Sequence, residues 1–125
     1  MTIRLTIAAI TAALLLATGA VRADGDAKRG EKLFEECHAC HSTEAGSQGV
    51  GPSLRGVFGR KAGEQSDFRY SPAIKRSGIT WTPQTLDGFI AEPQKVVPAN
   101  RMPYSGMPDA RDRADLIAYL QQAFK

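Results

Sequence analysis

The sequence predicts a small all-α domain. Apolar residues recur at helical spacing near both ends of the chain, and two shorter segments between them start with a hydroxyl residue followed by proline, which is typical of helix starts. No segment shows the alternating pattern of a half-buried strand. The chain has 125 residues, a length that suits one domain and no more.

The first helix is expected to follow Asp26, a candidate N-cap. Apolar residues from Ala27 to Cys37 share one face of this helix with Gly30. Glycine inside a helix costs on the order of 1 kcal/mol relative to alanine. We therefore expect Gly30 to mark a close approach of a second helix.

The last helix is expected after Pro108, with an apolar stripe over residues 116–124. Arg113 and Asp115 are assigned to its solvent-exposed side. If this stripe crosses the Gly30 face of the first helix, both surfaces become buried.

Two shorter helices are expected in the middle of the chain. Ser71 can cap a helix that begins at Pro72 and stops at Gly78, and Thr82 can cap one that covers residues 83–92. Proline in the first turn and glycine past the end fit the known preferences of helix termini.

The stretch Cys37-His38-Ala39-Cys40-His41 carries the clearest chemical signal. Two thiols three positions apart, followed by histidine, are the pattern for covalent haem attachment. Each thiol adds across one haem vinyl group, and His41 then serves as the proximal iron ligand. Three alternatives fit less well. A thioredoxin-like dithiol sits in a βαβ setting, a zinc site needs about four ligands, and a disulfide here would close a very small loop.

Two long irregular segments, residues 42–70 and 93–107, are rich in glycine and proline. Loops this long are uncommon in a compact domain unless they have a function. Wrapping a large flat cofactor is such a function, and haem would also complete a core for which the helices supply few large apolar residues.

The N-terminus predicts a secretory signal peptide. Arg4 precedes an apolar run over residues 5–17, which is short for a membrane-spanning helix of about 20 apolar residues. Cleavage is expected after Ala23, giving a signal peptide over residues 1–23 and a mature domain over 24–125; an uncleaved anchor is the alternative. Covalent haem attachment in bacteria occurs outside the cytoplasmic membrane, so the expected compartment is the periplasm.

The formal net charge of +3 overstates the charge of the mature chain, because the signal peptide contains Arg4 and Arg22 and no acidic residue. A nearly neutral mature chain argues against a nucleic-acid-binding protein. Any electrostatic steering must come from how charges are distributed over the surface.

Taken together, these features resemble the class I c-type cytochromes, close to the mitochondrial cytochrome c and bacterial cytochrome c2 group. The resemblance covers essentially all of the mature sequence. It is carried by residues 25–30, 37–41, 51–54, 56–61, 78–81, 101–106 and 113–120. It implies the cytochrome c fold, with crossing terminal helices and one haem c attached covalently through Cys37 and Cys40.

The resemblance also implies a second axial ligand, a methionine in the late proline-rich loop. Met102 and Met107 both precede proline, and Met102 occupies the family position. The backbone carbonyl of Pro52 is expected to accept a hydrogen bond from the free ring nitrogen of His41. The residues that match donors to a haem propionate are Arg60, Tyr70 and Trp81.

Three positions depart from the family pattern. Phe89, Asn100 and Ile74 stand where a tyrosine, a threonine and an asparagine are usual. We expect these changes to remove polar groups near the ligand loop, and so to affect the reduction potential and the iron–sulfur bond.

The resemblance implies a soluble electron carrier rather than an enzyme, passing one electron between redox partners of a respiratory or photosynthetic chain. The expected partners are a bc1-type complex, a terminal oxidase, a photosynthetic reaction centre or a periplasmic dehydrogenase, each met by a monomer in brief docking. A basic ring is expected around the haem edge, formed by Lys61, Lys95 and Arg101, with Arg55 and Lys75.

Two other functions stay open at this point. A haem subunit bound permanently to a larger periplasmic dehydrogenase would have the same fold. A haem peroxidase needs an open iron position, which a Met102 ligand would close.

Overall fold

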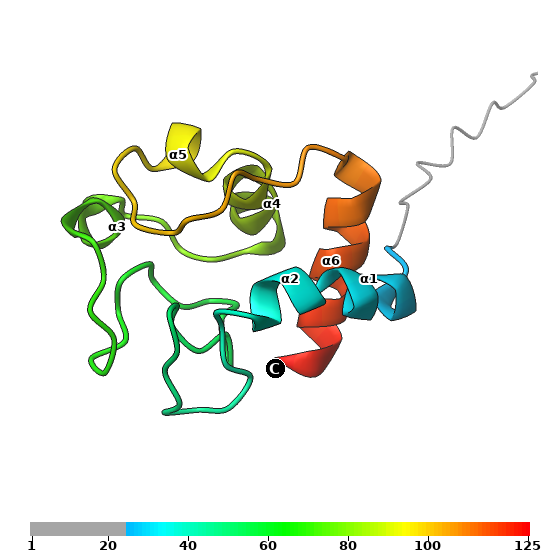
Figure 1. Ribbon diagram of the computed structural model, residues 1–125, viewed down its shortest axis with the longest axis horizontal. Helices are drawn as coiled ribbons and strands as arrows, with labels where there is room; N and C mark the ends of the chain where they lie inside the picture. The colour runs from blue at the N-terminus through cyan, green and yellow to red at the C-terminus, as the bar shows by residue number, and fades with distance from the viewer. Residues whose placement is uncertain (1–24) are drawn as a thin grey trace, which may run out of the picture.

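Short helices joined by long loops make up residues 25–125, the part of the chain that the computed structural model describes (Figure 1). The signal peptide predicted over residues 1–23 lies outside these residues. The helices of the described part are α1 (Ala27–Leu33), α2 (Glu35–His38), α3 (Pro72–Arg76), α4 (Pro83–Ala91), α5 (Pro93–Val96) and α6 (Ala110–Ala123). Within residues 25–125, β structure is limited to one isolated bridge between Lys61 and Thr80. The all-α prediction is confirmed.

The predicted helix starts are confirmed by side-chain caps. The Asp26 carboxylate accepts the backbone N–H groups of the first turn of α1 at 3.0 and 3.1 Å. The Ser71 hydroxyl accepts the Ile74 N–H at 3.1 Å. Thr82 and Thr85 form a reciprocal capping box at the start of α4, in which each side chain accepts a backbone N–H that the helix leaves unpaired.

Two details of the helices differ from the prediction. The first helix does not run unbroken to Cys37, because Phe34 forms a turn between α1 and α2 while its backbone stays in the right-handed helical region. The segment from Pro93 contains the four-residue helix α5, which was expected to be irregular. A helix of one turn is too short to show an apolar period.

The terminal helices α1 and α6 cross each other (Figure 1). At the crossing, a Cβ atom on Gly30 would collide with the Asp115 carbonyl and would lie 2.9 Å from Tyr119 Cβ. The close approach predicted from Gly30 is therefore confirmed, and it is an approach of backbone to backbone.

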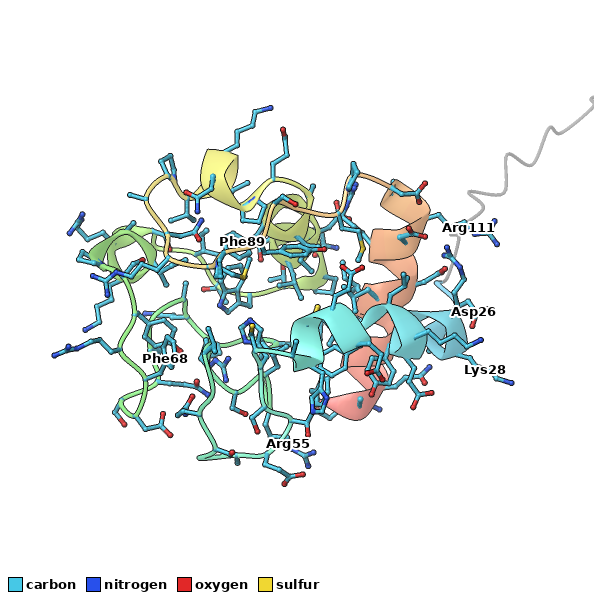
Figure 2. All side chains as sticks on the ribbon, viewed as in Figure 1. Asp26, Lys28, Arg55, Phe68, Phe89 and Arg111 are labelled. Atoms are coloured by element: carbon cyan, nitrogen blue, oxygen red, sulfur yellow. The ribbon has the colours of Figure 1, made fainter. Side chains whose placement is uncertain are left out.

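The core lies where α4 and the α1–α2 turn meet α6. Its buried members are Phe34, Leu86, Met107, Leu116, Ile117, Leu120 and Phe124. The Phe34 ring lies 5.3 Å from those of Tyr119 and Phe124, measured between centroids. In Figure 2 the labelled Phe89 points inward, whereas Lys28, Arg55 and Arg111 lie at the periphery.

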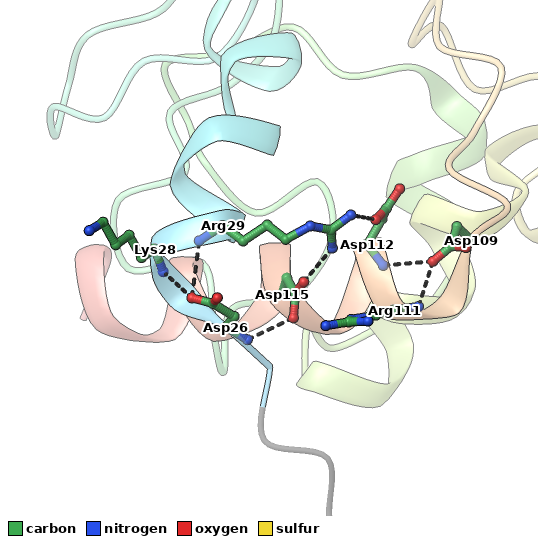
Figure 3. Close-up of polar contacts among 7 residues, drawn as sticks. All are labelled: Asp26, Lys28, Arg29, Asp109, Arg111, Asp112 and Asp115. Carbon is green, nitrogen blue, oxygen red and sulfur yellow. Dashed lines mark hydrogen bonds and ion pairs between the residues drawn. The ribbon is translucent and has the colours of Figure 1, made fainter.

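Two charged residues of α6 are not on the solvent side, as they were predicted to be. Asp115 is only 3 % exposed; its carboxylate accepts the Asp26 N–H at 2.7 Å and pairs with Arg29 (Figure 3). Arg113 is largely buried and donates from Nε to Asp87 at 2.8 Å. For Asp115 the reason is tertiary, because the segment that leads into α1 docks on α6 and the Asp26 backbone N–H needs an acceptor there.

No helix among residues 25–125 is both long enough and apolar enough to cross a lipid bilayer.

Candidate haem site

A cavity of about 340 Å³ lies inside the fold. Its walls come from α2 and the loop over residues 42–70 on one side, and from α3, α4 and the segment 100–104 on the other. They are predominantly apolar, with Leu54, Val57, Ile74, Leu86, Phe89 and Leu120 among the lining residues. This volume is within the range of about 300–1,000 Å³ that is usual for small-molecule and cofactor sites.

Every site residue predicted from the sequence lines this one cavity. These residues are Cys37, Cys40, His41, Pro52, Arg60, Tyr70, Trp81 and Met102. They come from segments far apart in the sequence, so the long loops bring together a set of groups that no single helix could present.

The two cysteines lie on α2 and in the turn that follows it. The backbone N–H groups of Cys40 and His41 donate to the Cys37 carbonyl at 3.1 and 2.9 Å, which keeps both thiols on one helical turn. They are not joined by a disulfide. Burial, helped by the neighbouring Glu36 charge, raises the pKa of the Cys37 thiol to about 11.

The His41 ring is fixed from two sides. Its Nδ1 donates to the Pro52 carbonyl at 2.7 Å, which leaves Nε2 as the nitrogen with a free lone pair. A Cβ atom on Gly51 would lie 2.7 Å from Nδ1 and 2.8 Å from Nε2, so only glycine fits beside the ring. Burial lowers the pKa of His41, which favours the neutral imidazole that can bind a metal.

The two methionines of the late loop have different surroundings. Met102 is half-buried and lines the cavity. Met107 is 6 % exposed and belongs to the hydrophobic core with Phe34 and Leu116. Met107 therefore has a packing environment, whereas Met102 presents its side chain to the cavity.

The three predicted propionate donors line the cavity, and each of them also forms a hydrogen bond within the protein. Arg60 donates from Nη1 and Nη2 to backbone carbonyls in the segment 53–55, both at 3.0 Å. The Tyr70 hydroxyl donates to Gln65 Oε1 at 3.2 Å. The backbone N–H of Trp81 donates to the Arg60 carbonyl at 2.9 Å, which joins two of these donors through the main chain.

A family-wide sequence profile described as Cytochrome c matches residues 27–124. The chain belongs to the cytochrome c family. A cytochrome c2 of Rhodoblastus acidophilus is 48 % identical over 99 residues, which cover 78 % of this chain and 92 % of that protein. A cytochrome c2 of Rhodomicrobium vannielii is 43 % identical over 115 residues, 91 % of each chain.

The fold agrees with the family. The solved structure of cytochrome cH from Methylobacterium extorquens superposes with a TM-score of 0.74 and 45 % sequence identity, covering 78 % of this chain and 99 % of that one. The predicted cytochrome c fold, with crossing terminal helices and long loops around the cofactor, is confirmed.

As a cytochrome c, this chain carries one haem c, attached covalently through Cys37 and Cys40. Its cavity fits that cofactor. The walls are apolar, the two thiols lie on one helical turn at the edge, and the His41 ring and the Met102 thioether both border the same space. This set of groups agrees with how haem proteins of this type hold their cofactor.

Asn100 was expected to leave fewer polar groups near the ligand loop, and this expectation was wrong. The Asn100 side chain is buried and forms hydrogen bonds with three backbone groups. Its role depends on contacts within the folded loop that residue type alone does not reveal.

Two further residues at the cavity edge were missed. The Tyr104 hydroxyl donates to the Glu36 carboxylate at 3.4 Å, and both residues line the cavity. Burial, together with the Glu36 charge, raises the pKa of Tyr104 to about 12. Since 68 positions separate the two residues, no local pattern could have linked them.

The basic ring predicted around the cavity is only partly reproduced. Arg101 is exposed and lines the cavity. Arg69, which was not among the residues predicted for the ring, is exposed and lines the cavity as well. Lys95 forms an ion pair with Glu92 at 3.0 Å, so part of its charge is offset by a neighbour.

Proposed function

We propose that this protein is an exported one-electron carrier of the bacterial periplasm, with His41 and Met102 as the axial ligands of its haem iron. At the coarser level it is an electron-transfer protein with a single haem, as members of the cytochrome c family are. The observation that carries the proposal is that an oriented imidazole and a thioether both border the haem cavity.

Each residue of the proposed site has a distinct task. The bound haem supplies one-electron exchange between ferrous and ferric iron. Pro52 holds the His41 ring so that Nε2 is free to bind. Met102 offers a neutral thioether, a ligand that raises the reduction potential. The apolar walls exclude water, which strengthens electrostatic interactions inside the cavity.

The assignment of Met102 is tested by two alanine substitutions in the holoprotein. Met102→Ala should abolish the far-red methionine–iron absorption band of the ferric protein and lower the midpoint potential, while the haem stays attached. Met107→Ala should keep the band but lower the free energy of unfolding by about 2–5 kcal/mol, as expected for a truncated core residue. The reverse pattern would identify Met107 as the ligand.

Export is proposed from residues 1–23, with the mature domain beginning at residue 24. The N-terminal sequence of protein purified from periplasm tests this directly. A mature chain that begins at Asp24 is expected, and a chain that retains its first 23 residues in a membrane fraction would favour the uncleaved anchor.

We propose transient docking through the cavity edge to a redox partner such as a bc1-type complex, a terminal oxidase, a reaction centre or a periplasmic dehydrogenase. Arg101 is exposed at this edge, whereas Lys28 is exposed on α1, away from the cavity. Arg101→Gln should therefore slow oxidation by a membrane oxidase and flatten its salt dependence, and Lys28→Gln should leave both unchanged. Equal effects of the two substitutions would remove the role of Arg101 in steering.

A further inference from the structure

Asn100 is the most heavily bonded residue of the segment that carries Met102. It is 7 % exposed. Its Nδ2 donates to the carbonyls of Pro93 and Val97, both at 2.9 Å, and its Oδ1 accepts the Met102 N–H at 2.9 Å. Gln94 Nε2 donates to the Asn100 carbonyl at 3.0 Å. Asn100 is therefore bonded to α5 and to the methionine at the same time.

The contacts with α5 add a second donor to carbonyls that each already accept one backbone N–H. The Val97 N–H donates to the Pro93 carbonyl at 3.0 Å, and the Asn100 N–H donates to the Val97 carbonyl at 3.2 Å. A backbone carbonyl has two lone pairs and can accept a second hydrogen bond. The Pro93 and Val97 carbonyls, at the start and just past the end of α5, both accept from the Asn100 amide. Pro93 is fully buried. The amide thus links Met102 to a fixed part of the fold.

The backbone is bent to make this link. Ala99 has a φ of 65°, the one non-glycine residue with positive φ among residues 25–125. A side chain other than glycine adopts this conformation only where the surrounding structure holds it. Here the turn directs Asn100 back toward α5.

The far end of the segment is also held. The Met107 N–H donates to the Ile90 carbonyl of α4 at 2.9 Å. Gly106 has a φ of 116°, and a Cβ atom on it would collide with the Ala91 carbonyl. Between these two ends, Met102 is only two residues from Asn100, so Asn100 is the anchor that acts on it most directly.

We propose that Asn100 is the positioning residue of Met102, which fixes the methionine backbone to α5 and so limits how readily the thioether leaves the iron. This inference rests on the proposed function, in which Met102 is the axial ligand. Removing the amide leaves the Met102 N–H without its side-chain acceptor and takes the second donor from the Pro93 and Val97 carbonyls, so detached states of the segment gain population.

The test measures how fast added imidazole replaces the methionine in the ferric holoprotein, followed as loss of the far-red band in stopped flow. Asn100→Ala should raise this rate about tenfold, the scale of one lost buried hydrogen bond. Asn100→Asp keeps an oxygen that can accept the Met102 N–H but replaces the amide donor with a carboxylate oxygen that faces the Pro93 and Val97 carbonyls. Because these oxygens repel each other, its rate should be at least as high as that of Asn100→Ala.

A matched control separates positioning from general loss of stability. Thr85 Oγ1 caps α4 through the Thr82 N–H at 2.8 Å and does not contact the Met102 segment. Thr85→Ala should lower the free energy of unfolding while its displacement rate stays within about twofold of wild type. A Thr85→Ala rate raised as much as that of Asn100→Ala, or an Asn100→Ala rate equal to that of wild type, would overturn the proposal.

Two further results can be told apart: failure of the Asn100→Ala variant to assemble, and failure of the Met102 assignment itself. If Asn100→Ala does not assemble, Gln94→Ala, which removes only the side chain bonded to the Asn100 carbonyl, should still raise the rate by about threefold; no change there would equally overturn the proposal. If the wild-type ferric protein lacks the far-red band, the Met102 assignment itself fails. If the wild-type protein has the band but the Asn100 and Gln94 variants show the wild-type displacement rate, only the proposed role of Asn100 is refuted.

Discussion

At the scale of single residues, the site depends on small groups as much as on the ligands. Gly51 and Pro52 both set the position of the His41 ring. Gly51 leaves room for the ring because it has no side chain, and the Pro52 carbonyl accepts a hydrogen bond from the ring. The imidazole therefore has a defined orientation before any metal contact is considered. A residue with a side chain at position 51 would collide with the imidazole.

Gly51→Ala should disturb the His41 ring. The new Cβ atom would lie 2.7 Å from Nδ1, closer than any relaxed contact, so either the ring or the loop must move. We expect a loss of about 1–3 kcal/mol in the free energy of unfolding, as for other overpacked sites. Paramagnetically shifted NMR signals of His41 in the ferric protein report its orientation. Signals and stability identical to those of wild type would contradict this account of Gly51.

At the scale of elements, the crossing of α1 and α6 is the contact between the two ends of the domain. Aromatic packing around Phe34 covers one side of the crossing, and the Arg29 ion pairs with Asp112 and Asp115 cover another (Figure 3). The stability of the crossing should therefore depend on side-chain volume through the packed side and on pH through the ion-paired side.

Gly30→Ala tests the volume available at the crossing. Alanine favours an isolated helix by about 1 kcal/mol over glycine, but here its Cβ atom would collide with the Asp115 backbone. Overpacking typically costs about 1–3 kcal/mol, so the net effect on the free energy of unfolding should be destabilising. Gly88→Ala in α4 is the matched control because nothing lies within 4 Å of its added Cβ atom. It should be neutral or stabilising, and equal effects of the two substitutions would contradict the crossing geometry.

Asp115 should make stability depend on pH. The hydrogen bond from the Asp26 N–H, and then the Arg29 guanidinium, lower the pKa of Asp115 in the folded protein. A lowered folded pKa means that the unfolded chain binds more protons in acid, so stability is present above the ordinary aspartate pKa of about 3.9 and is lost as pH falls below it.

The measurement is the free energy of unfolding of the holoprotein between pH 3 and pH 7, for wild type and Asp115→Asn. The wild-type curve should fall more steeply in acid, and the gap between the two proteins should narrow there. Parallel curves would show that Asp115 contributes no pH dependence. Other acid-sensitive groups, such as the Asp109 cap, are common to both proteins and cancel in the comparison.

At the scale of the whole molecule, features with local causes could be predicted from the sequence. The caps at Asp26, Ser71 and Thr82 depend on neighbouring backbone groups only, and all three form as expected. The spacing of Cys37 and Cys40 is local as well, since one helical turn sets it. Gly30 was informative because a glycine inside a helix needs a reason.

Features with tertiary causes could not be predicted in this way. Asp115 is buried because the segment around Asp26 docks on it. Asn100 is buried although it is polar, because the Pro93 and Val97 carbonyls and the Met102 N–H all bond to its side chain. The helix α5 itself is a single turn, below the length at which periodicity is visible. Both methionines precede proline, so local sequence does not distinguish them. That Met102 is the one beside the cofactor was therefore predicted from the family resemblance.

The largest expected effect at this scale is the loss of the fold without haem. Leu86, Leu116 and Leu120 belong both to the hydrophobic core and to the cavity wall, so the core is continuous with the cofactor site. Burying several hundred Å² of apolar cofactor surface contributes on the order of 10 kcal/mol. Domains of this kind have a total stability of about 5–15 kcal/mol.

Replacing both Cys37 and Cys40 with serine should therefore do more than remove the colour from a haem-stained denaturing gel. Without attached haem, the leucines of the cavity wall have no apolar surface to pack against. We expect the remaining contact between α1 and α6 to be too small to hold residues 42–107 in place. The exported variant should show reduced helical circular dichroism and no cooperative unfolding transition. A haem-free variant that unfolds cooperatively near the wild-type midpoint would mean that the loops fold on their own, so that the protein part alone forms the cavity.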